Sequence, residues 1–343
     1  MSGEAAFTGV LKRIAGGETL SAEESANAFA AIMRGTVPET QMAALLTALA
    51  IRKPTIAEIT GAVQAMRGAM LSVKAPPGAI DMCGTGGDGH GTLNVSTAAS
   101  FVVAGCGVPV AKHGNRNMSS RTGAADVLEA LGITIDVPPG MAERALAEAN
   151  LCFLFAQSYH PAMKHVGPVR RALGFRTIFN LLGPLSNPAR VKRQLIGVFS
   201  EDWVSPVAEV LAALDTEAAW VVHGSDGMDE LSTTAPTHTA MLADGRYARQ
   251  QVDARAYGFP PATLAQLKGG TAEENARAIH HLLDGEEGPF RDIVLLNAGA
   301  ALVVAGKTEE LRDGIATAAE AIDSGAARQA LEQLRACTQG VRA

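Results

Sequence analysis

A glycine-rich segment directly after an apolar run is the feature that most constrains this chain. Residues 79–83 have the composition of a buried β-strand, and the next residues read Gly84-Thr85-Gly86-Gly87-Asp88. Because glycine has no side chain, the backbone N–H groups of such a loop can approach a ligand closely, as they do around phosphates. A second segment, Lys112-His113-Gly114-Asn115-Arg116, adds cationic and amide donors for anionic oxygens. Together the two segments predict a phosphate-binding site beside the end of a strand.

Gly84, Gly86 and Gly89 also match the spacing of the dinucleotide-binding fingerprint. That fingerprint requires a helix that begins at its third glycine, whereas here residues 90–97 lie between the glycines and the next apolar run. The following strand, expected at 108–111, ends in Lys112 and His113 rather than in the acid that would hold a ribose diol. These residues favour a phosphorylated sugar over a dinucleotide.

The order of patterns along the chain predicts a helical part followed by an α/β part. The first seventy residues carry apolar side chains at helical spacing, and two capping boxes, Ser21–Glu24 and Thr55–Glu58, mark helix starts. Beyond them, runs of strand length alternate with helical patterns, which is typical of α/β proteins. We therefore predict a helical domain over 1–75 and an α/β domain over 76–343. Strands are expected at 79–83, 108–111, 133–136, 152–155, 194–199, 218–223, 237–242 and 292–296.

Composition narrows the class of protein. A length of 343 residues allows about two domains, and 47% hydrophobic residues suffice for their cores. The net charge of −6 argues against a nucleic-acid-binding protein, which is usually basic. No signal peptide and no apolar span of about twenty residues is visible, so we expect a cytoplasmic protein. The cysteines lack metal-ligand spacing and are expected to be buried or incidental thiols: Cys83, Cys106, Cys152 and Cys337.

Ordered segments between residues 84 and 230 resemble the anthranilate phosphoribosyltransferase family. The resemblance implies a small all-helical N-terminal domain, to which part of 167–190 returns, and a larger α/β domain with a central, mostly parallel sheet, as in nucleoside phosphorylases and phosphoribosyltransferases. It also implies transfer of the phosphoribosyl group of 5-phosphoribosyl 1-pyrophosphate to the amine of anthranilate, in tryptophan biosynthesis, by a homodimer formed through the helical domain. The matching segments are Gly84–Asp88, Asn94–Thr97, Lys112–Arg116, Ser119-Ser120, Gly123–Gly132, Arg176–Pro188 and Asp229-Glu230.

The same resemblance carries over a set of site residues. Mg²⁺ is expected on Ser96, Asp229 and Glu230, because Mg²⁺ prefers few carboxylates together with waters and substrate phosphates. The anthranilate site is expected to be lined by Gly84, His113, Asn115, His160, Arg170 and Pro184, with the Arg170 guanidinium on the acceptor carboxylate. Phosphoribosyl pyrophosphate is expected on Gly84, Gly86, Gly87, Asp88, Thr92, Asn94, Val95, Ser96, Thr97, Lys112, His113, Gly114, Asn115, Arg116, Ser119, Ser120 and Ala124.

No residue is assigned as a catalytic acid or base. The amine of anthranilate is already a usable nucleophile, and an oxocarbenium-like transition state depends more on stabilised charge and a good leaving group than on a strong base.

Three alternatives stay open at this point. Ser96-Thr97 stands at the start of a helical run, where a hydroxyl commonly serves as an N-cap and not as a phosphate ligand. A pyrimidine nucleoside phosphorylase would have the same fold and a similar Lys-His-x-Asn-Arg segment, although Asp229-Glu230 and the stretch Asn180–Pro184 favour the transferase. A catalytically silent relative that binds nucleic acid or a regulatory ligand is disfavoured by the acidic net charge.

Overall fold

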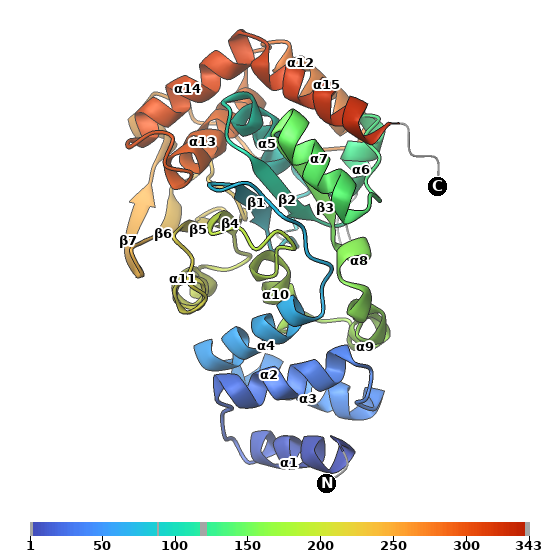
Figure 1. Cartoon of the computed structure of the whole chain (residues 1–343). Coiled ribbons are helices and arrows are strands. Elements are labelled where there is room, and N and C mark those ends of the chain that lie inside the picture. The colour runs from blue at the N-terminus through green and yellow to red at the C-terminus, as the bar shows by residue number, and fades with distance from the viewer. Residues whose placement is uncertain (1–2, 88, 117–121, 340–343) are drawn as a thin grey trace.

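The N-terminal helices form the lower part of the molecule in Figure 1. The computed structural model describes residues 3–87, 89–116 and 122–339. At Gly61 a Cβ atom would lie 2.1 Å from the Ala22 carbonyl oxygen, so glycine lets two helix backbones cross in close contact. The two helices are α2 and α4. The N-terminal helices are α1 (Gly3–Ala15), α2 (Ala22–Met33), α3 (Glu39–Arg52) and α4 (Ile56–Gly68).

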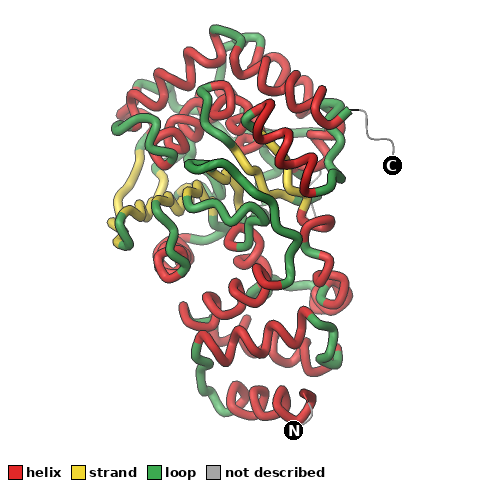
Figure 2. The backbone as a smooth tube through the Cα atoms, viewed as in Figure 1, coloured by secondary structure: helices red, strands yellow, loops and turns green. Residues whose placement is uncertain are grey.

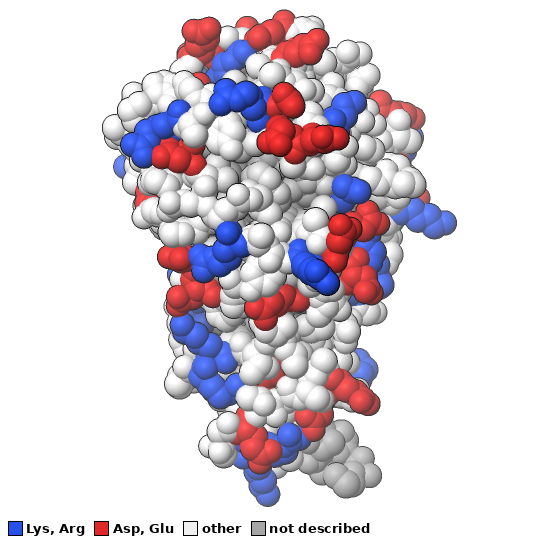
Figure 3. Space-filling view, turned by 90° about the vertical axis from the view of Figure 1, so that its left-hand side faces the viewer, with Lys and Arg blue, Asp and Glu red and all other residues white. Residues whose placement is uncertain are grey.

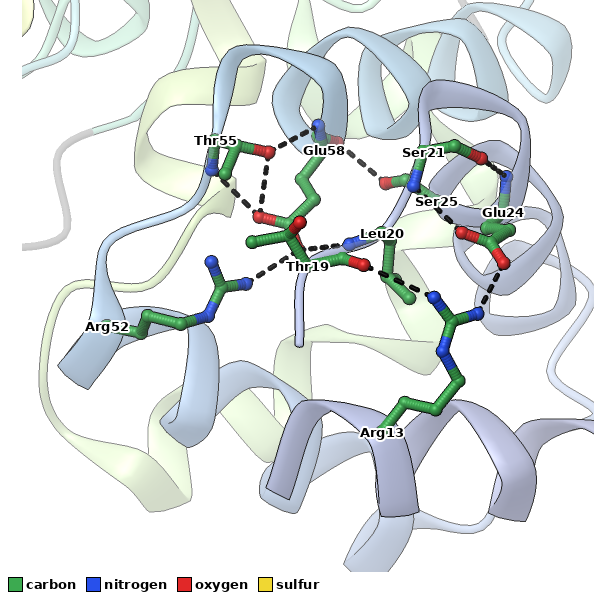
Figure 4. A network of polar contacts seen from close by, with 9 residues as sticks. All are labelled: Arg13, Thr19, Leu20, Ser21, Glu24, Ser25, Arg52, Thr55 and Glu58. Carbon is green, nitrogen blue, oxygen red and sulfur yellow. Dashed lines mark hydrogen bonds and ion pairs between the residues drawn. The ribbon is translucent and has the colours of Figure 1, made fainter. Parts of the chain in front are cut away.

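A buried carboxylate ties this helical layer together (Figure 4). Both predicted capping boxes are confirmed, at Ser21 before α2 and at Thr55 before α4. The Glu58 side chain, 0% exposed, accepts hydrogen bonds from Leu20 N at 2.9 Å and from Thr55 N at 2.8 Å. It also accepts one from Arg52 Nη2 at 2.6 Å. One carboxylate therefore caps α4, holds the end of α3 and fixes the chain entering α2.

We expect Glu58→Gln to destabilise the protein strongly. Every partner of the carboxylate oxygens is a donor, so an amide NH₂ group at this place would face another N–H group. Removing one member of a buried ion pair costs about 3–5 kcal/mol. Urea denaturation followed by circular dichroism measures this loss. The matched control is Glu24→Gln in the half-exposed pair with Arg13, which should change the denaturation midpoint little; an equal loss in both variants would contradict the argument.

A single mixed sheet forms the centre of the larger part. Its strand order is β3-β2-β1-β4-β5-β6-β7, parallel from β3 to β5 and antiparallel from β5 to β7. Parallel strands end at the same edge, so the loops after them lie close together. The strands are β1 (Ile80–Gly84), β2 (Val110–Gly114), β3 (Leu151–Phe155), β4 (Arg193–Gly197), β5 (Ala218–Gly224), β6 (Thr237–Ala243) and β7 (Arg246–Val252).

Helices cover both faces of the sheet (Figure 1). Met82 of β1 belongs to one hydrophobic core and its neighbour Cys83 to the other, as expected of a strand buried on both faces. The sheet face toward the N-terminal helices is covered by α10 (Phe179–Leu185) and α11 (Val204–Ala213). On the opposite side, strands contact α5 (Val95–Gly105), α7 (Pro139–Ala149), α13 (Pro289–Val304) and α15 (Ala326–Thr338). The same hydrophobic core is completed by α6 (Ala124–Ala130), α12 (Ala272–Leu283) and α14 (Leu311–Asp323), which contact other helices.

A segment after β3 returns to the N-terminal helices. It contains α8 (Ala156–Tyr159) and α9 (Gly167–Leu173) before α10; α9 contacts α3, and α10 contacts α4. The connection from α4 to β1 is loop (Figure 2), held by hydrogen bonds from Leu71 N to Tyr159 O and from Val73 N to Pro188 O. The two parts of the molecule are thus joined by several chain segments.

The predicted fold class is confirmed, and two predicted strands are wrong. Residues 292–296 lie inside α13, whose buried residues surround the helix, because a short apolar run is the same for a buried helix and a buried strand. Residues 133–136 form no strand: Ile133 and Ile135 are buried, but the segment is a loop between α6 and α7. The strand that was missed, β7, is mostly exposed and therefore carries no apolar run.

Two features of the described residues concern helix length and surface charge. In the part of the chain that the structure describes, no helix has both the length and the apolar character needed to cross a membrane. Acidic and basic side chains alternate over the face drawn in Figure 3, where neither sign forms a continuous patch among the residues described.

Candidate active site

Two glycines at the carboxyl ends of β1 and β4 make room for Asp229. Gly84 and Gly197 are paired in the sheet. A Cβ atom on Gly84 would lie 2.3 Å from Asp229 Oδ2, and one on Gly197 would lie 1.5 Å from the Asp229 carbonyl oxygen. The backbone contact excludes a side chain at position 197, and a side chain at position 84 would displace the Asp229 carboxylate. Gly197 was missed at the sequence level, because no pattern around it signals that a distant loop crosses β4 at this position.

The loop that carries Asp229 and Glu230 is anchored on both sides of the pair. Before the pair, Met228 O accepts a hydrogen bond from Gly224 N at 2.8 Å, at the end of β5. After it, Leu231 N donates to Asn297 Oδ1 of α13 at 3.0 Å. Both Met228 and Leu231 are fully buried. The two carboxylates therefore project from a fixed segment.

Backbone N–H groups from two other segments meet these carboxylates. Gly86 N donates to Asp229 Oδ2 at 2.7 Å, and Ser96 N, in the first turn of α5, donates to Glu230 Oε1 at 3.2 Å. Gly86 and Gly87 have φ values of +68° and +76°, which glycine adopts freely. N–H groups of a glycine-rich turn and of a helix N-terminus are the backbone groups that bind anions.

Lys112 lies beneath the start of α5. It is part of β2, which extends further than predicted, and is only 3% exposed. Its Nζ donates to Met82 O at 2.6 Å and to Ser96 Oγ at 3.1 Å. Burial lowers the pKa of Lys112, and the negative charge of Asp81 opposes that effect. The N-cap of α5 is Asn94 rather than Ser96, so the capping alternative for Ser96 is wrong and its hydroxyl bonds the lysine.

Asp81 holds the backbone around the Lys112–Arg116 segment. Its carboxylate is completely buried and accepts hydrogen bonds from His113 N at 3.0 Å and from Asn187 Nδ2 at 2.8 Å. Asn187 Nδ2 also donates to Ala111 O at 2.8 Å. Burial raises the pKa of Asp81, against the lowering effect of the Asn187 hydrogen bond. Sequence reasoning gave Asp81 no role, since it lies within an expected strand.

Two buried imidazoles lie next to α10. His113 Nδ1 is 3.1 Å from Gly183 O, and its Nε2 is 3.2 Å from His160 Nε2. A ring nitrogen facing a carbonyl carries the hydrogen, so His113 Nε2 accepts the hydrogen of His160 Nε2. Burial lowers the pKa of His113 to about 3 and that of His160 to about 4. Both rings are therefore neutral at physiological pH. Pro184, the residue after Gly183, is also buried.

Arg170 of α9 is half-buried, with its guanidinium carbon 5.8 Å from the centre of the Phe179 ring. Burial lowers its pKa. In the described part of the chain, no carboxylate lies within ion-pair distance of this guanidinium. A cation taken partly out of water without an anionic partner is the arrangement that a ligand carboxylate would complete.

Four other predicted ligands of phosphoribosyl pyrophosphate contact other parts of the protein or lie in its interior. Arg116 is exposed, and hydrogen bonds to Glu129 and Asp126 of α6 raise its pKa, so its charge is already paired. Asn115 Oδ1 accepts from Arg116 N at 2.8 Å. Val95 and Thr97 are buried in the core.

Four predicted residues lie at the margin of these contacts, and three lie outside the described residues. Thr92 forms an isolated antiparallel β-bridge with Lys268. A Cβ atom on Gly114 would lie 2.7 Å from the Phe153 ring and 3.5 Å from the Ala124 side chain. The carbonyl of Gly87 accepts a hydrogen bond from Arg176, whose guanidinium carbon is 4.4 Å from the centre of the Phe199 ring. The residues outside the described ranges are Asp88, Ser119 and Ser120.

Comparisons with known proteins agree with this fold. The glycosyl transferase family, a/b domain, matches residues 76–328, and the glycosyl transferase family, helical bundle domain, matches residues 8–70. Anthranilate phosphoribosyltransferase of Rhodopseudomonas palustris strain HaA2 is 56% identical over 328 residues, which cover 96% of this chain and 97% of the relative.

Two solved structures extend the similarity to the whole chain. The anthranilate phosphoribosyltransferase of Thermus thermophilus superposes with a TM-score of 0.92 at 43% identity, over 96% of this chain and 99% of the other. That of Saccharomyces cerevisiae, in complex with PRPP and Mg, gives a TM-score of 0.90 at 27% identity, over 98% and 99%. On these similarities over nearly its full length, the chain belongs to the anthranilate phosphoribosyltransferase family.

Proposed function

We propose that this chain binds phosphoribosyl pyrophosphate at the carboxyl edge of its sheet and anthranilate beside α9 and α10. As a member of its family it transfers the 5-phosphoribosyl group to the amine of anthranilate, giving N-(5-phosphoribosyl)anthranilate and pyrophosphate, in tryptophan biosynthesis. The observation that carries the site assignment is the pair of N–H groups, on Gly86 and Ser96, that converge on anionic oxygens. Phosphoribosyl pyrophosphate carries a pyrophosphate and a 5-phosphate, so its binding needs backbone N–H groups from more than one segment.

Mg²⁺ is proposed to bind Ser96, Asp229 and Glu230. All three offer oxygen, the ligand that this ion prefers, and the S. cerevisiae relative was solved with PRPP and Mg. Among the residues that the structure describes, no three His, Cys, Asp or Glu side chains gather as a complete metal site. An ion held by two carboxylates and a hydroxyl would take its remaining ligands from water and substrate. When bound, Mg²⁺ supplies positive charge that stabilises the leaving pyrophosphate.

Anthranilate is proposed to lie with its carboxylate on Arg170 and its ring near His113, His160 and Pro184. The neutral state of both imidazoles suits an aromatic ring, and the unpaired guanidinium suits the carboxylate. Held in this way, the amine attacks the anomeric carbon while the C–O bond to pyrophosphate breaks, and the ammonium proton is then lost. No side chain is needed as a strong base, because the amine lone pair is free.

One assay tests the proposed function. The full-length chain with phosphoribosyl pyrophosphate, anthranilate and Mg²⁺ should release pyrophosphate while the fluorescence of anthranilate changes, and omission of any one component should stop both signals. Phosphorolysis of a pyrimidine nucleoside by inorganic phosphate, without the first reaction, would instead support the phosphorylase alternative.

Domain division, assembly and location are proposed as well. We propose one domain over 1–75 with part of 167–190 and another over 76–343, which the contacts of α9 with α3 and of α10 with α4 support. A homodimer through the helices between Ala6 and Met70 is supported by Ile51 of α3, an apolar side chain that is 81% exposed. Sedimentation should give twice the chain mass of 35.5 kDa; a monomer would contradict the dimer. The charged substrates favour a cytoplasmic location.

A further inference from the structure

We propose that Asn275, on α12, is a positioning residue that orients the side chain of Asn94 toward phosphoribosyl pyrophosphate. The inference rests on the proposed function, in which Asn94 is a ligand of that substrate. Asn275 belongs to none of the segments that carry the family resemblance, and 181 positions separate it from Asn94 in the sequence.

The orientation of the Asn275 amide follows from a donor of fixed polarity. A backbone N–H group can only donate, and Gly270 N lies 2.8 Å from one end of the amide, which must therefore be Oδ1. The opposite end, Nδ2, lies 2.8 Å from the side chain of Asn94 and donates to it, so the Asn94 atom at this contact is Oδ1. Two hydrogen bonds in series thus fix both amides.

Burial makes this arrangement difficult to reverse. Asn275 is 1% exposed, so water cannot replace either bond. If its amide turned over, NH₂ would face the N–H of Gly270 and oxygen would face oxygen at Asn94, leaving buried polar groups unsatisfied. The contact is also close on the other side, because a Cβ on Gly269 would lie 3.0 Å from Asn275 Nδ2.

As a consequence, the Nδ2 end of the Asn94 side chain can donate hydrogen bonds to a ligand. Asn94 is the N-cap of α5, yet its side chain makes no capping hydrogen bond, and its oxygen instead accepts one from Asn275. Its Nδ2 hydrogens are left at the start of α5, the helix end at which Ser96 N donates to a carboxylate. An Asn94 amide of the opposite orientation would present a carbonyl oxygen to a phosphate, which repels it.

A purely structural role is the competing account. The segment around Gly269 also packs on the loop before α5, through hydrogen bonds from Leu93 N to Leu267 O and from Gly269 N to Gly91 O, each at 2.9 Å. Asn275 could in that case act only by holding the two segments together. The two accounts differ in what happens when the shape of Asn275 is kept and its donor is removed.

Asn275→Asp makes this change. Asp keeps an acceptor for Gly270 N but cannot donate, so the Asn94 NH₂ group should turn toward residue 275 and its oxygen toward the substrate. We expect the KM for phosphoribosyl pyrophosphate to rise about tenfold or more, as for loss of a hydrogen bond to a charged group, while the KM for anthranilate and the melting temperature change little. The control is Glu274→Gln, which alters the first turn of the same helix without touching Asn94 and should leave both KM values unchanged.

A double-mutant cycle with Asn94→Ala completes the test. If Asn275 acts through Asn94, Asn94→Ala alone raises the KM for phosphoribosyl pyrophosphate, and adding Asn275→Asp raises it no further. Fully additive effects, or equal rises in both KM values, would mean that Asn275 only packs, and would overturn the inference. A rise in Asn94→Ala with none in Asn275→Asp would overturn it too.

The remaining outcome separates this inference from the proposed function. No effect of Asn94→Ala would remove Asn94 from the substrate site and the inference with it, while pyrophosphate release in the full assay would still support the transferase. If Asn275→Asp lowers the melting temperature, the same measurements are made with Asn275→Ala instead. That variant leaves the Asn94 amide free to adopt both orientations, so a smaller rise confined to the same KM is expected; no rise at all would overturn the inference.

Discussion

Replacing Asp229 by Asn and Glu230 by Gln together should abolish most turnover and leave the fold intact. The two amides keep acceptor oxygens for Gly86 N and Ser96 N but lose both negative charges, so Mg²⁺ capture is weakened. Metal stabilisation of a leaving group is worth several kcal/mol, which corresponds to a decrease in kcat/KM of about a hundredfold or more. Initial rates over a Mg²⁺ titration measure the loss of turnover, and melting temperatures show whether the fold is intact.

The control for this variant is Asp202→Asn. Asp202 is an exposed carboxylate paired with Lys53, so its loss should alter neither the rate nor the dependence on Mg²⁺. Normal activity of the double variant at limiting Mg²⁺ would remove Asp229 and Glu230 from the proposed metal site.

Arg170→Ala should raise the KM for anthranilate strongly and leave the KM for phosphoribosyl pyrophosphate nearly unchanged. The guanidinium lies on α9, whereas the N–H groups at the sheet edge belong to the loop after β1 and to α5, so the two substrates should respond separately. Loss of a charge-assisted bidentate contact is worth roughly 1.5–3 kcal/mol, or about a ten- to hundredfold weaker interaction. Arg170→Lys should recover only part of this, because an ammonium cannot reproduce the planar fork.

The neighbouring residue provides the control for Arg170. Arg171 lies on the same helix with an exposed side chain, so Arg171→Ala should change neither KM value. If Arg170→Ala affected both substrates equally, or lowered the melting temperature by as much as it weakened binding, the arginine would be a packing residue of α9.

The fold could be predicted from sequence wherever burial and local pattern agree. Strands β1 to β6 carry apolar runs, and the capping boxes gave the starts of α2 and α4 within the local sequence. Strand β7 has little buried surface, and its only signal was the Asp244-Gly245 pair, with φ values of +51° and +72°, which forms the hairpin turn from β6. Residues 292–296 were wrongly predicted as a strand, because a helix that is buried on all sides has no amphipathic period.

For the candidate site, sequence reasoning reached the segments but not the residues that hold them. The glycine-rich loop and the acidic pair are local patterns, so they were visible. Gly197, Asp81 and Asn275 act through contacts with distant parts of the chain, and a lone glycine, aspartate or asparagine gives no sign of such a contact. Arg116 pairs with two carboxylates of α6, a contact that the sequence also does not show, and its binding of phosphoribosyl pyrophosphate stays a prediction.

The hydrogen bonds from Gly86 and Ser96 to the acidic pair give the proposed binding step the character of an exchange. A phosphate bound at these N–H groups would displace a carboxylate that already occupies them, and the displaced Asp229 and Glu230 would then be available to the proposed metal ion. Part of the affinity for phosphoribosyl pyrophosphate would be lost in this competition, because the protein's own carboxylates bind the same N–H groups. On product release, the same carboxylates would return to Gly86 N and Ser96 N, so these two backbone groups would keep a hydrogen-bond partner.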